Sequence, residues 1–385
     1  RNLGANKKTF RGQTRSMEYN RGYINENKGI QRPPAEITFY EELKALSISD
    51  KQKKPGTWKL SPWAVLKYIM GGEISGGITI SPKYIGNQKI VEIAIASLLS
   101  DRALLLTGFP GTAKTWLAEH LAAAISGDST LLIQGTSGTH EDLLKYGWNY
   151  ASLISKGPTE EGLIPSPVML AMQKGSIARI EELSRIPTET QDALLSILSE
   201  KTVSIPELRK LIPAQQGFNI IATSNDLDKG VYEMSSALRR RFNIVYMPLP
   251  TSVQEEIDIV TYRVNQLGRN LNIPLAEVKE KQVQKLVTLL RELRNGITED
   301  GKTKLRKSGA SLNPAVSINI IHEARILAQF FDNGEVKPQH MIAKLINSIR
   351  HDSPEDASAI QEYNETVLKK RDEYKEWYQA IKKEI

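Results

Sequence analysis

Cysteine is absent from this 385-residue sequence, and so is any long run of apolar residues. Without cysteine the chain can form neither disulfide bonds nor thiolate metal sites, which fits a reducing compartment, and we expect a cytoplasmic protein. No stretch approaches the roughly 20 apolar residues of a membrane-spanning helix, so we expect no membrane partner. The five histidines show no metal-ligand spacing. An apolar share of 40% and a charged share of 25% are typical of a globular chain that buries a core.

The excess positive charge is concentrated near the N-terminus. The net charge of the whole chain is +7, while residues 1–34 contain eight Lys or Arg and only two Glu. Because this segment is also rich in Asn and Gly and poor in apolar residues, we expect it to be disordered by itself. A basic tail can bind nucleic acid or an acidic partner, but a solvated tail is the simpler interpretation.

Apolar runs of strand length alternate with helical patterns from residue 83 onwards. The expected strands cover residues 103–107, 131–134, 177–181, 218–223 and 244–247, and the helices between them include 115–126 and 189–200. This alternation predicts an α/β fold, with a parallel sheet covered by helices on both faces. After residue 250 only helical patterns follow, at 283–294, 315–331 and 341–350, which predicts an all-α domain.

These patterns divide the chain into five segments. They are a disordered basic tail (1–34), an N-terminal extension with one or two helices (35–82), an α/β domain (83–250), a helical domain (251–353) and a charged C-terminal helix (354–385).

A glycine-containing loop, GFPGTAKT at residues 108–115, separates the first expected strand from a helix. Strand, loop and helix together are the setting of a phosphate-binding P-loop, although a glycine turn that merely caps a helix is the alternative. Gly108 and Gly111 let backbone N–H groups face a phosphate, and the helix N-terminus adds its dipole. Lys114 would then bind the β- and γ-phosphates and Thr115 would ligate Mg²⁺, so ATP and Mg²⁺ are the expected cofactors.

Two adjacent carboxylates, Glu181 and Glu182, end the expected strand at 177–181. In a P-loop ATPase, an acid at this place supports the metal and its neighbour polarises the attacking water. The alternative is an exposed pair at a helix start, where carboxylates suit the helix dipole. Two features do not fit the usual pattern: Glu181 is one methylene longer than the usual Asp, and Arg179 interrupts a strand that should be buried.

Two further polar sites follow strand or helix ends. Asn225 comes directly after the strand at 218–223 and can position the water beside Glu182, although Asn is also common in turns. Arg241, with Arg240 beside it, ends a short helix before the fifth strand. Cations suit helix C-termini, but this is also where an arginine finger would reach the ATP of a neighbouring subunit.

These motifs resemble those of the AAA+ superfamily and, within it, the MoxR family, over roughly residues 83–350. The resemblance includes Ala113, where the general P-loop pattern has glycine, and it implies the AAA+ core followed by a helical lid. It also implies that residues 147–167 form an insert and that residues 202–213 form a hairpin. The site residues implied for ATP are Tyr84, Ile85, Gly86, Gly108, Pro110, Gly111, Thr112, Ala113, Lys114, Thr115 and Trp116; those for magnesium are Thr115 and Glu181; those for catalysis are Glu182, Asn225, Arg241 and Arg240.

The sequence departs from the family in the lid as well as at Glu181. The family's sensor 2 arginine should open a lid helix, yet residues 310–317 contain no arginine, and either Arg306 or Arg325 is a possible substitute. The resemblance implies an ATPase that forms a homo-hexameric ring and remodels or activates a partner protein, often one with a von Willebrand factor A domain. Two alternatives remain open: a nucleic-acid motor, which the basic tail favours weakly, and a nucleotide-gated scaffold with little turnover.

Overall fold

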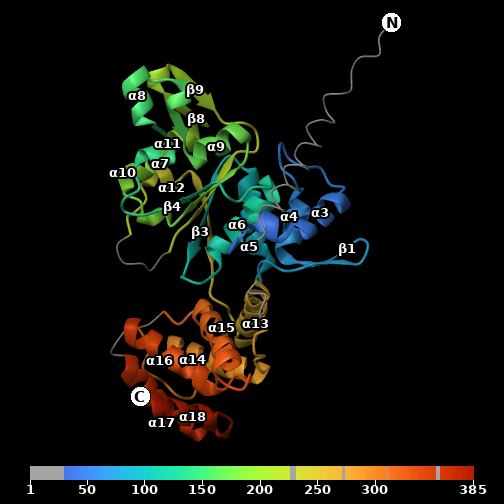
Figure 1. The fold of residues 1–385 in the computed structure, drawn as a ribbon, viewed down its shortest axis with the longest axis vertical. Helices are drawn as coiled ribbons and strands as arrows, with labels where there is room; N and C mark the ends of the chain where they lie inside the picture. The colour runs from blue at the N-terminus through green and yellow to red at the C-terminus, as the bar shows by residue number, and fades with distance from the viewer. Residues whose placement is uncertain (1–29, 226–230, 271–273, 310, 353–355) are drawn as a thin grey trace.

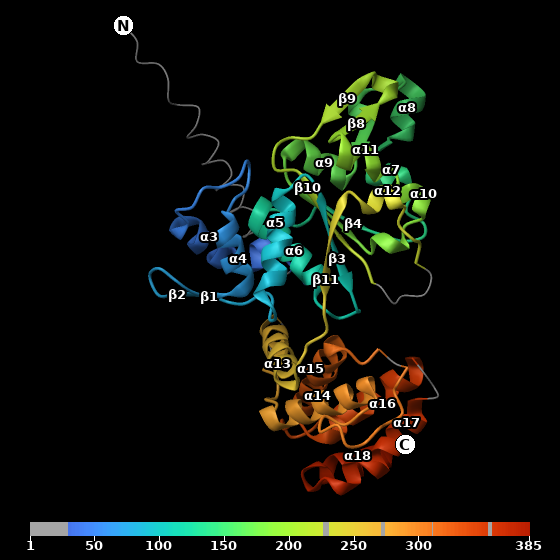
Figure 2. The same ribbon diagram turned by 180° about the vertical axis from the view of Figure 1, so that it is seen from behind.

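The computed structural model describes residues 30–225, 231–270, 274–309, 311–352 and 356–385. Residues 1–29 of the expected basic tail and Asp226, beside Asn225, lie outside the described residues. An α/β core occupies the middle of the molecule, with the N-terminal extension on one flank and the helical domain at one end (Figures 1 and 2).

The core is built on a five-stranded parallel sheet in which β3 and β10 lie beside each other near the centre. Its strands, in spatial order, are β11 (Phe242–Met247), β3 (Ala103–Gly108), β10 (Asn219–Thr223), β7 (Ile177–Glu181) and β4 (Leu132–Gln134). Every neighbouring pair is parallel. The five strands expected from the apolar runs are therefore all present, and the predicted α/β fold class is confirmed.

The pleat of the strands sends alternate side chains to two separate cores. On β3, Leu104 and Leu106 face the cluster that contains α5 and α6, while Ala103 and Leu105 face the cluster that contains α9 and α11. The helices of the core are α5 (Gln88–Leu99), α6 (Lys114–Ser126), α7 (Glu141–Leu144), α9 (Pro167–Lys174), α10 (Thr188–Gln191), α11 (Leu194–Ser199) and α12 (Ser236–Arg239). The helix expected over residues 189–200 is thus two short helices, α10 and α11.

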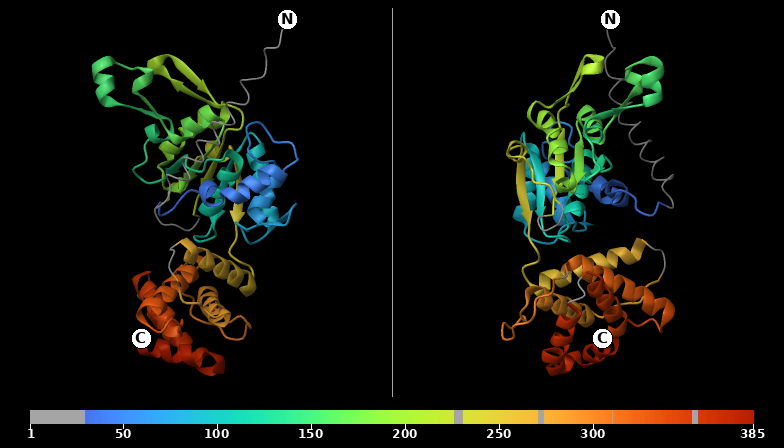
Figure 3. Two further views of the ribbon diagram at one scale, coloured as in Figure 1. Left: turned by 45° about the vertical axis from the view of Figure 1, so that its right-hand side comes forward. Right: turned by 90° about the vertical axis from the view of Figure 1, so that its left-hand side faces the viewer.

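Two antiparallel hairpins project from the core at the end far from the helical domain (Figures 1 and 3). One pairs β5 (Tyr146–Trp148) with β6 (Leu163–Pro165) and holds α8 (Tyr150–Lys156) between its strands. The other pairs β8 (Thr202–Ile205) with β9 (Lys210–Pro213). They correspond to the expected insert at 147–167 and the expected hairpin at 202–213.

The N-terminal extension packs directly on the core. It contains α2 (Ala35–Thr38), α3 (Tyr40–Ser49), α4 (Pro62–Met70) and the hairpin of β1 (Gly72–Ile74) and β2 (Ile78–Ile80). Tyr68 of α4 is fully buried and shares a hydrogen bond of 2.8 Å with Nδ1 of His120 on α6. Lys83 follows this hairpin; its Nζ lies 4.4 Å from the ring centres of both Phe39 and Tyr68 and donates to Glu42 at 2.6 Å.

The helical domain includes the charged C-terminal segment in its own core. Its helices are α13 (Val253–Asn270), α14 (Glu280–Asn295), α15 (Pro314–Phe331), α16 (Pro338–Asp352), α17 (Asp356–Thr366) and α18 (Lys375–Glu384). The single helix expected at 354–385 is two helices, α17 and α18, with two 3₁₀ turns between them. Trp377 is fully buried, and Arg371 pairs at 2.9 Å with Glu292, a buried carboxylate of α14. Among the described residues no helix has both the length and the apolar character that crossing a bilayer requires.

The position of Trp377 yields a stability prediction. Its indole is fully buried against the helical domain, and its Nε1 donates to Gln282 at 2.8 Å. Replacing it with alanine leaves a large cavity, so we expect Trp377→Ala to lower the free energy of unfolding by about 3–5 kcal/mol. Glu376→Ala, at the exposed neighbouring position on α18, is the matched control and should change little. Equal urea-unfolding midpoints for the two variants would contradict the packing described here.

Lys83 yields a prediction about pH. Burial lowers the pKa of its ammonium to about 8 from an ordinary value of 10.5, and Glu42 offsets only part of that effect. Between these two pH values the unfolded chain binds more protons than the folded one, so the contribution of Lys83 to stability rises with pH through this window. We therefore expect the unfolding free energy of the wild type to gain on that of Lys83→Met between pH 8 and 10. The control is Lys44→Met, which replaces an exposed lysine of α3 and should show no such trend; a flat difference for Lys83→Met would refute the prediction.

Candidate nucleotide-binding site

The loop between β3 and α6 has the geometry of a phosphate-binding loop. Gly108 ends β3 and pairs with Met247 of β11. A Cβ at this position would lie 2.3 Å from the carbonyl oxygen of Met247, so only glycine fits there. Ala113 is the N-cap of α6 and has left-handed backbone angles of φ 65° and ψ 22°, which explains why glycine is usual at that place. Lys114 is buried, and its Nζ donates to the carbonyl oxygens of Gly108 and Phe109 at 2.9 and 2.7 Å.

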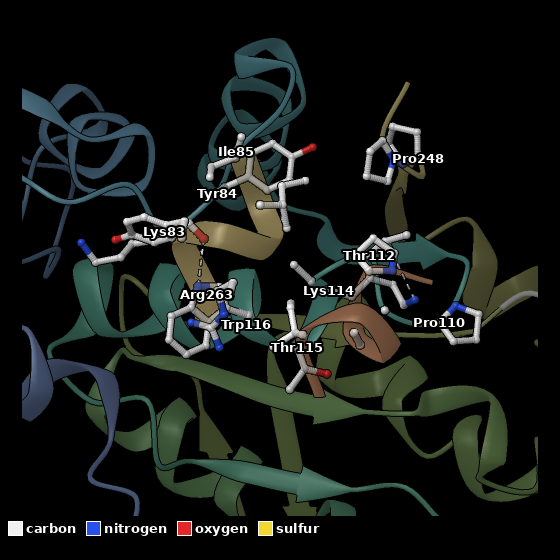
Figure 4. Close-up of a pocket in the computed structure, with 18 of the residues that line it drawn as sticks. Lys83, Tyr84, Ile85, Pro110, Thr112, Lys114, Thr115, Trp116, Pro248 and Arg263 are labelled. Carbon is white, nitrogen blue, oxygen red and sulfur yellow. Dashed lines mark hydrogen bonds between the residues drawn. The ribbon is translucent and has the colours of Figure 1, made fainter. Parts of the chain in front are cut away.

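A cleft of about 790 Å³ opens over this loop and is lined by the core, the end of the extension and the helical domain. Figure 4 shows P-loop residues on one part of its wall and Lys83, Tyr84 and Ile85 on another. The expected site residues that line it are Tyr84, Ile85, Pro110, Gly111, Thr112, Ala113, Lys114, Thr115, Trp116, Glu182 and Asn225. Five further expected site residues do not line it: Gly86, Gly108, Glu181, Arg240 and Arg241.

Tyr84, Trp116 and Arg263 line one side of the cleft. The indole of Trp116 donates from Nε1 to the carbonyl oxygen of Lys83 at 2.8 Å, and the guanidinium of Arg263 lies 3.7 Å from its ring centre (Figure 4). Burial, with a smaller contribution from the charge of Glu255, raises the pKa of Tyr84 to about 12, so its hydroxyl stays neutral. Arg263 belongs to α13 and was not expected from the sequence, because a single arginine on an amphipathic helix carries no motif.

The carboxyl ends of β7 and β10 bring the second group of site residues beside the P-loop. Glu181 is buried, and its Oε2 accepts hydrogen bonds from the hydroxyls of Thr115 at 2.8 Å and Thr223 at 2.6 Å. Its Oε1 accepts from Nη2 of Arg179 at 2.8 Å. The arginine that interrupts the strand pattern is therefore the ion-pair partner of the unusual glutamate. Glu181 and Thr115, the two residues expected to support magnesium, are therefore in direct contact.

Glu182 and Asn225 meet at the same edge of the sheet. Nδ2 of Asn225 donates to Oε1 of Glu182 at 2.6 Å, and the backbone N–H of Glu182 donates to Thr223 at 3.1 Å. Glu182 has a left-handed backbone, with φ 56° and ψ 48°, a conformation that costs free energy for a residue with a side chain and is concentrated at functional sites. The two residues that sequence reasoning assigned to the attacking water therefore touch each other and both line the cleft.

The donors present fit magnesium only as part of a nucleotide complex. Thr115 and Glu181 offer hydroxyl and carboxylate oxygens, the ligand type that this hard cation prefers. Within the described ranges no group of three or more His, Asp or Glu side chains could hold a metal ion. Any magnesium at this place would therefore take most of its ligands from phosphate and water, as Mg²⁺ commonly does.

Arg240 and Arg241 lie away from the cleft of their own chain. Arg241 donates from Nε to Ser199 and from Nη1 to the carbonyl of Ala237, both at 2.6 Å, whereas Arg240 is exposed. An action on the cleft of a second subunit remains the expectation for both.

The lid helix α15 begins where the sensor 2 arginine was expected. Its N-cap is Asn313, and a Cβ added to Gly111 of the P-loop would lie 2.5 Å from Oδ1 of this asparagine. Neither candidate substitute lines the cleft: Arg306 donates to Ser358 at 2.9 Å, and Arg325 donates to the carbonyls of Ala276 and Val264. The lid thus meets the phosphate loop through an asparagine, where the resemblance led us to expect an arginine.

Comparison with known proteins identifies two domains in the chain. Residues 103–242 match the AAA domain of the dynein-related subfamily, and residues 254–382 match the YehL-like AAA+ ATPase C-terminal domain. The second match runs through α17 and α18, in keeping with their place in the core of the helical domain.

Two curated bacterial proteins align with most of the chain. The uncharacterized protein YehL of Escherichia coli is 37% identical over 361 residues, which cover 92% of this chain and 98% of YehL. Chaperone MoxR1 of Mycobacterium tuberculosis is 28% identical over 285 residues, which cover 69% of this chain and 71% of MoxR1. Among solved structures, NtrX of Brucella abortus aligns at 15% identity with a TM-score of 0.43, over 64% of this chain and 52% of NtrX. The alignment with YehL spans nearly all of both proteins, the AAA match contains the P-loop described above, and the MoxR1 alignment covers 69% of the chain; the chain therefore belongs to the MoxR-type AAA+ ATPases.

Proposed function

We propose that this protein hydrolyses ATP in a magnesium-dependent reaction at a site shared between subunits of a ring, and that it uses the cycle to remodel or activate a partner protein. The observation that carries the catalytic part is the contact of Asn225 with Glu182 at 2.6 Å, beside Lys114 and Thr115 in one cleft. Phosphate-binding and water-activating groups are thereby within reach of the same ligand.

Each residue has a role that its position permits. The N–H groups of the P-loop and Lys114 bind the phosphates, and Trp116 and Tyr84 enclose the base. Glu182 accepts a proton from the attacking water, and Asn225 orients the Glu182 carboxylate and that water. Magnesium, held through Thr115 and Glu181, would neutralise charge on the β- and γ-phosphates.

A homo-hexameric ring accounts for the position of the arginines. A cation is needed beside the γ-phosphate in the transition state, yet Arg240 and Arg241 do not line the cleft of their own chain. A neighbouring subunit in a closed ring can present them to that cleft, which makes turnover depend on assembly.

The projecting hairpins support a protein partner. Tyr150 and Ile154 of α8 are 75% and 87% exposed, and Leu211 of β9 is 61% exposed. Large apolar side chains exposed together favour a protein contact. A client, or a partner with a von Willebrand factor A domain as in related systems, is the occupant we propose for this end of the ring.

The shared site is tested by steady-state ATP hydrolysis against protein concentration, with Glu182→Gln and Arg241→Ala measured alone and mixed. We expect specific activity to rise with concentration, and each variant alone to lose at least about 100-fold, because one lacks the base and the other the cation. A mixture should regain activity, since some interfaces then combine an intact Glu182 with an intact Arg241. Arg240→Ala, measured in the same way, decides which arginine is the finger.

Two outcomes would overturn parts of this proposal. Full activity at every dilution, with no recovery in the mixture, would place the site within one subunit. Tight ATP binding by the wild type with turnover no higher than that of Glu182→Gln would replace the remodelling ATPase with a nucleotide-gated scaffold.

A further inference from the structure

Two irregular residues of β7 lie on the same face of the strand. Arg179 and Glu181 are two positions apart, and Ile177 on the same face belongs to the apolar cluster under α6. The side chains of Arg179 and Glu181 are only 5% and 3% exposed. A charged pair therefore takes the place that apolar residues would normally fill in a central parallel strand.

The guanidinium of Arg179 is fixed from more than one side. Its Nη1 donates to the carbonyl oxygen of Ser129 at 2.9 Å, and its Nη2 donates to Oε1 of Glu181 at 2.8 Å. The same Nη2 lies 3.5 Å from the carbonyl oxygen of Thr115 in the first turn of α6. The arginine is thus held by the segment before β4, by its own strand and by the helix that starts at the P-loop.

This arrangement divides the two oxygens of Glu181 between different partners. Oε1 faces Arg179, while Oε2 accepts from Thr115 at 2.8 Å and from Thr223 at 2.6 Å. An aspartate at position 181 is one methylene shorter and could not span both Arg179 and the threonine hydroxyls from the same backbone. The arginine and the longer acid therefore account for each other.

We propose that Arg179 is a positioning residue for the metal-site carboxylate: by binding Oε1 of Glu181, it turns Oε2 towards Thr115 and the place where magnesium enters with the nucleotide. The inference rests on the proposed magnesium-dependent ATPase function and deepens it.

The test measures binding of a fluorescent, non-hydrolysable ATP analogue to the full chain, once with Mg²⁺ and once with EDTA. The quantity compared is the dissociation constant in EDTA divided by the dissociation constant with Mg²⁺. A larger ratio means that magnesium tightens the complex more. We expect Arg179→Met to reduce this ratio about tenfold, a common size for coupling between contacting residues, while the constant in EDTA changes by less than about twofold. Arg179→Lys keeps the charge but lacks the two guanidinium nitrogens that bind Ser129 and Glu181. We therefore expect its ratio to lie between those of Arg179→Met and the wild type.

A double-mutant cycle separates positioning from general stability. Glu181→Asp alone should reduce the ratio, because the shorter acid cannot serve Arg179 and Thr115 at once. Glu181→Asp combined with Arg179→Met should recover at least part of that loss, since the short acid is then released to Thr115. The matched control is Arg325→Met, which removes a partly buried lid arginine that binds only backbone carbonyls among the contacts described; it should leave the ratio unchanged.

The outcomes distinguish this inference from the proposed function. If Arg179→Met weakens binding by the same factor with Mg²⁺ and with EDTA, or if the double variant is no better than Glu181→Asp, the positioning role is wrong and the ATPase proposal stands. If the wild type binds the analogue equally well with and without magnesium, the inference is likewise wrong. A wild type that does not bind the analogue at all would overturn both.

Discussion

The geometry of the site depends on the hydrogen bonds and the ion pair of the Glu181 carboxylate. This carboxylate is buried, and it joins β7 to α6 through Thr115, to β10 through Thr223, and to its own strand through Arg179. A buried charge is tolerated only when its lone pairs are satisfied, so these contacts cannot be lost singly without a large penalty. Because β10 lies between β3 and β7, satisfying this one group also sets where the P-loop, Glu182 and Asn225 end up relative to one another.

The helical domain forms part of the cleft wall, and two of its side chains lie directly against residues of the core. Arg263 of α13 stacks on Trp116 at 3.7 Å, and Asn313, the cap of α15, closes against Gly111 of the P-loop. Trp116, the partner of Arg263, and Gly111, the partner of Asn313, both line the cleft that a ligand would occupy. A ligand shifts a domain arrangement only by binding one arrangement better than another, and these contacts lie where such a difference in affinity would arise.

The sequence predicted the parts of this structure that local pattern determines. The five strands, the P-loop and the acidic pair at the end of β7 follow from periodicity and spacing. Residues that act through tertiary contact were not predictable in this way. Arg179 is a charged residue in an apolar strand pattern, and only its contact with Glu181 explains it. Arg263 and Asn313 carry no sequence motif. The C-terminal segment was expected to be one charge-dense helix anchored by its aromatic residues, whereas it forms α17 and α18, with Tyr363 and Trp377 buried in the core that contains α14.

The pair of Arg179 and Glu181 is better understood as a geometric device than as a source of stability. Replacing both members of a buried ion pair with apolar side chains of similar volume is often neutral or stabilising, so stability alone does not require a charged pair at these two positions. What such a replacement cannot do is hold one carboxylate oxygen on Arg179 while the other accepts from Thr115 and Thr223. The bond of Arg179 to Ser129 supports this view, because it anchors the guanidinium independently of Glu181. The guanidinium that orients Glu181 is therefore itself held in place by the backbone at Ser129.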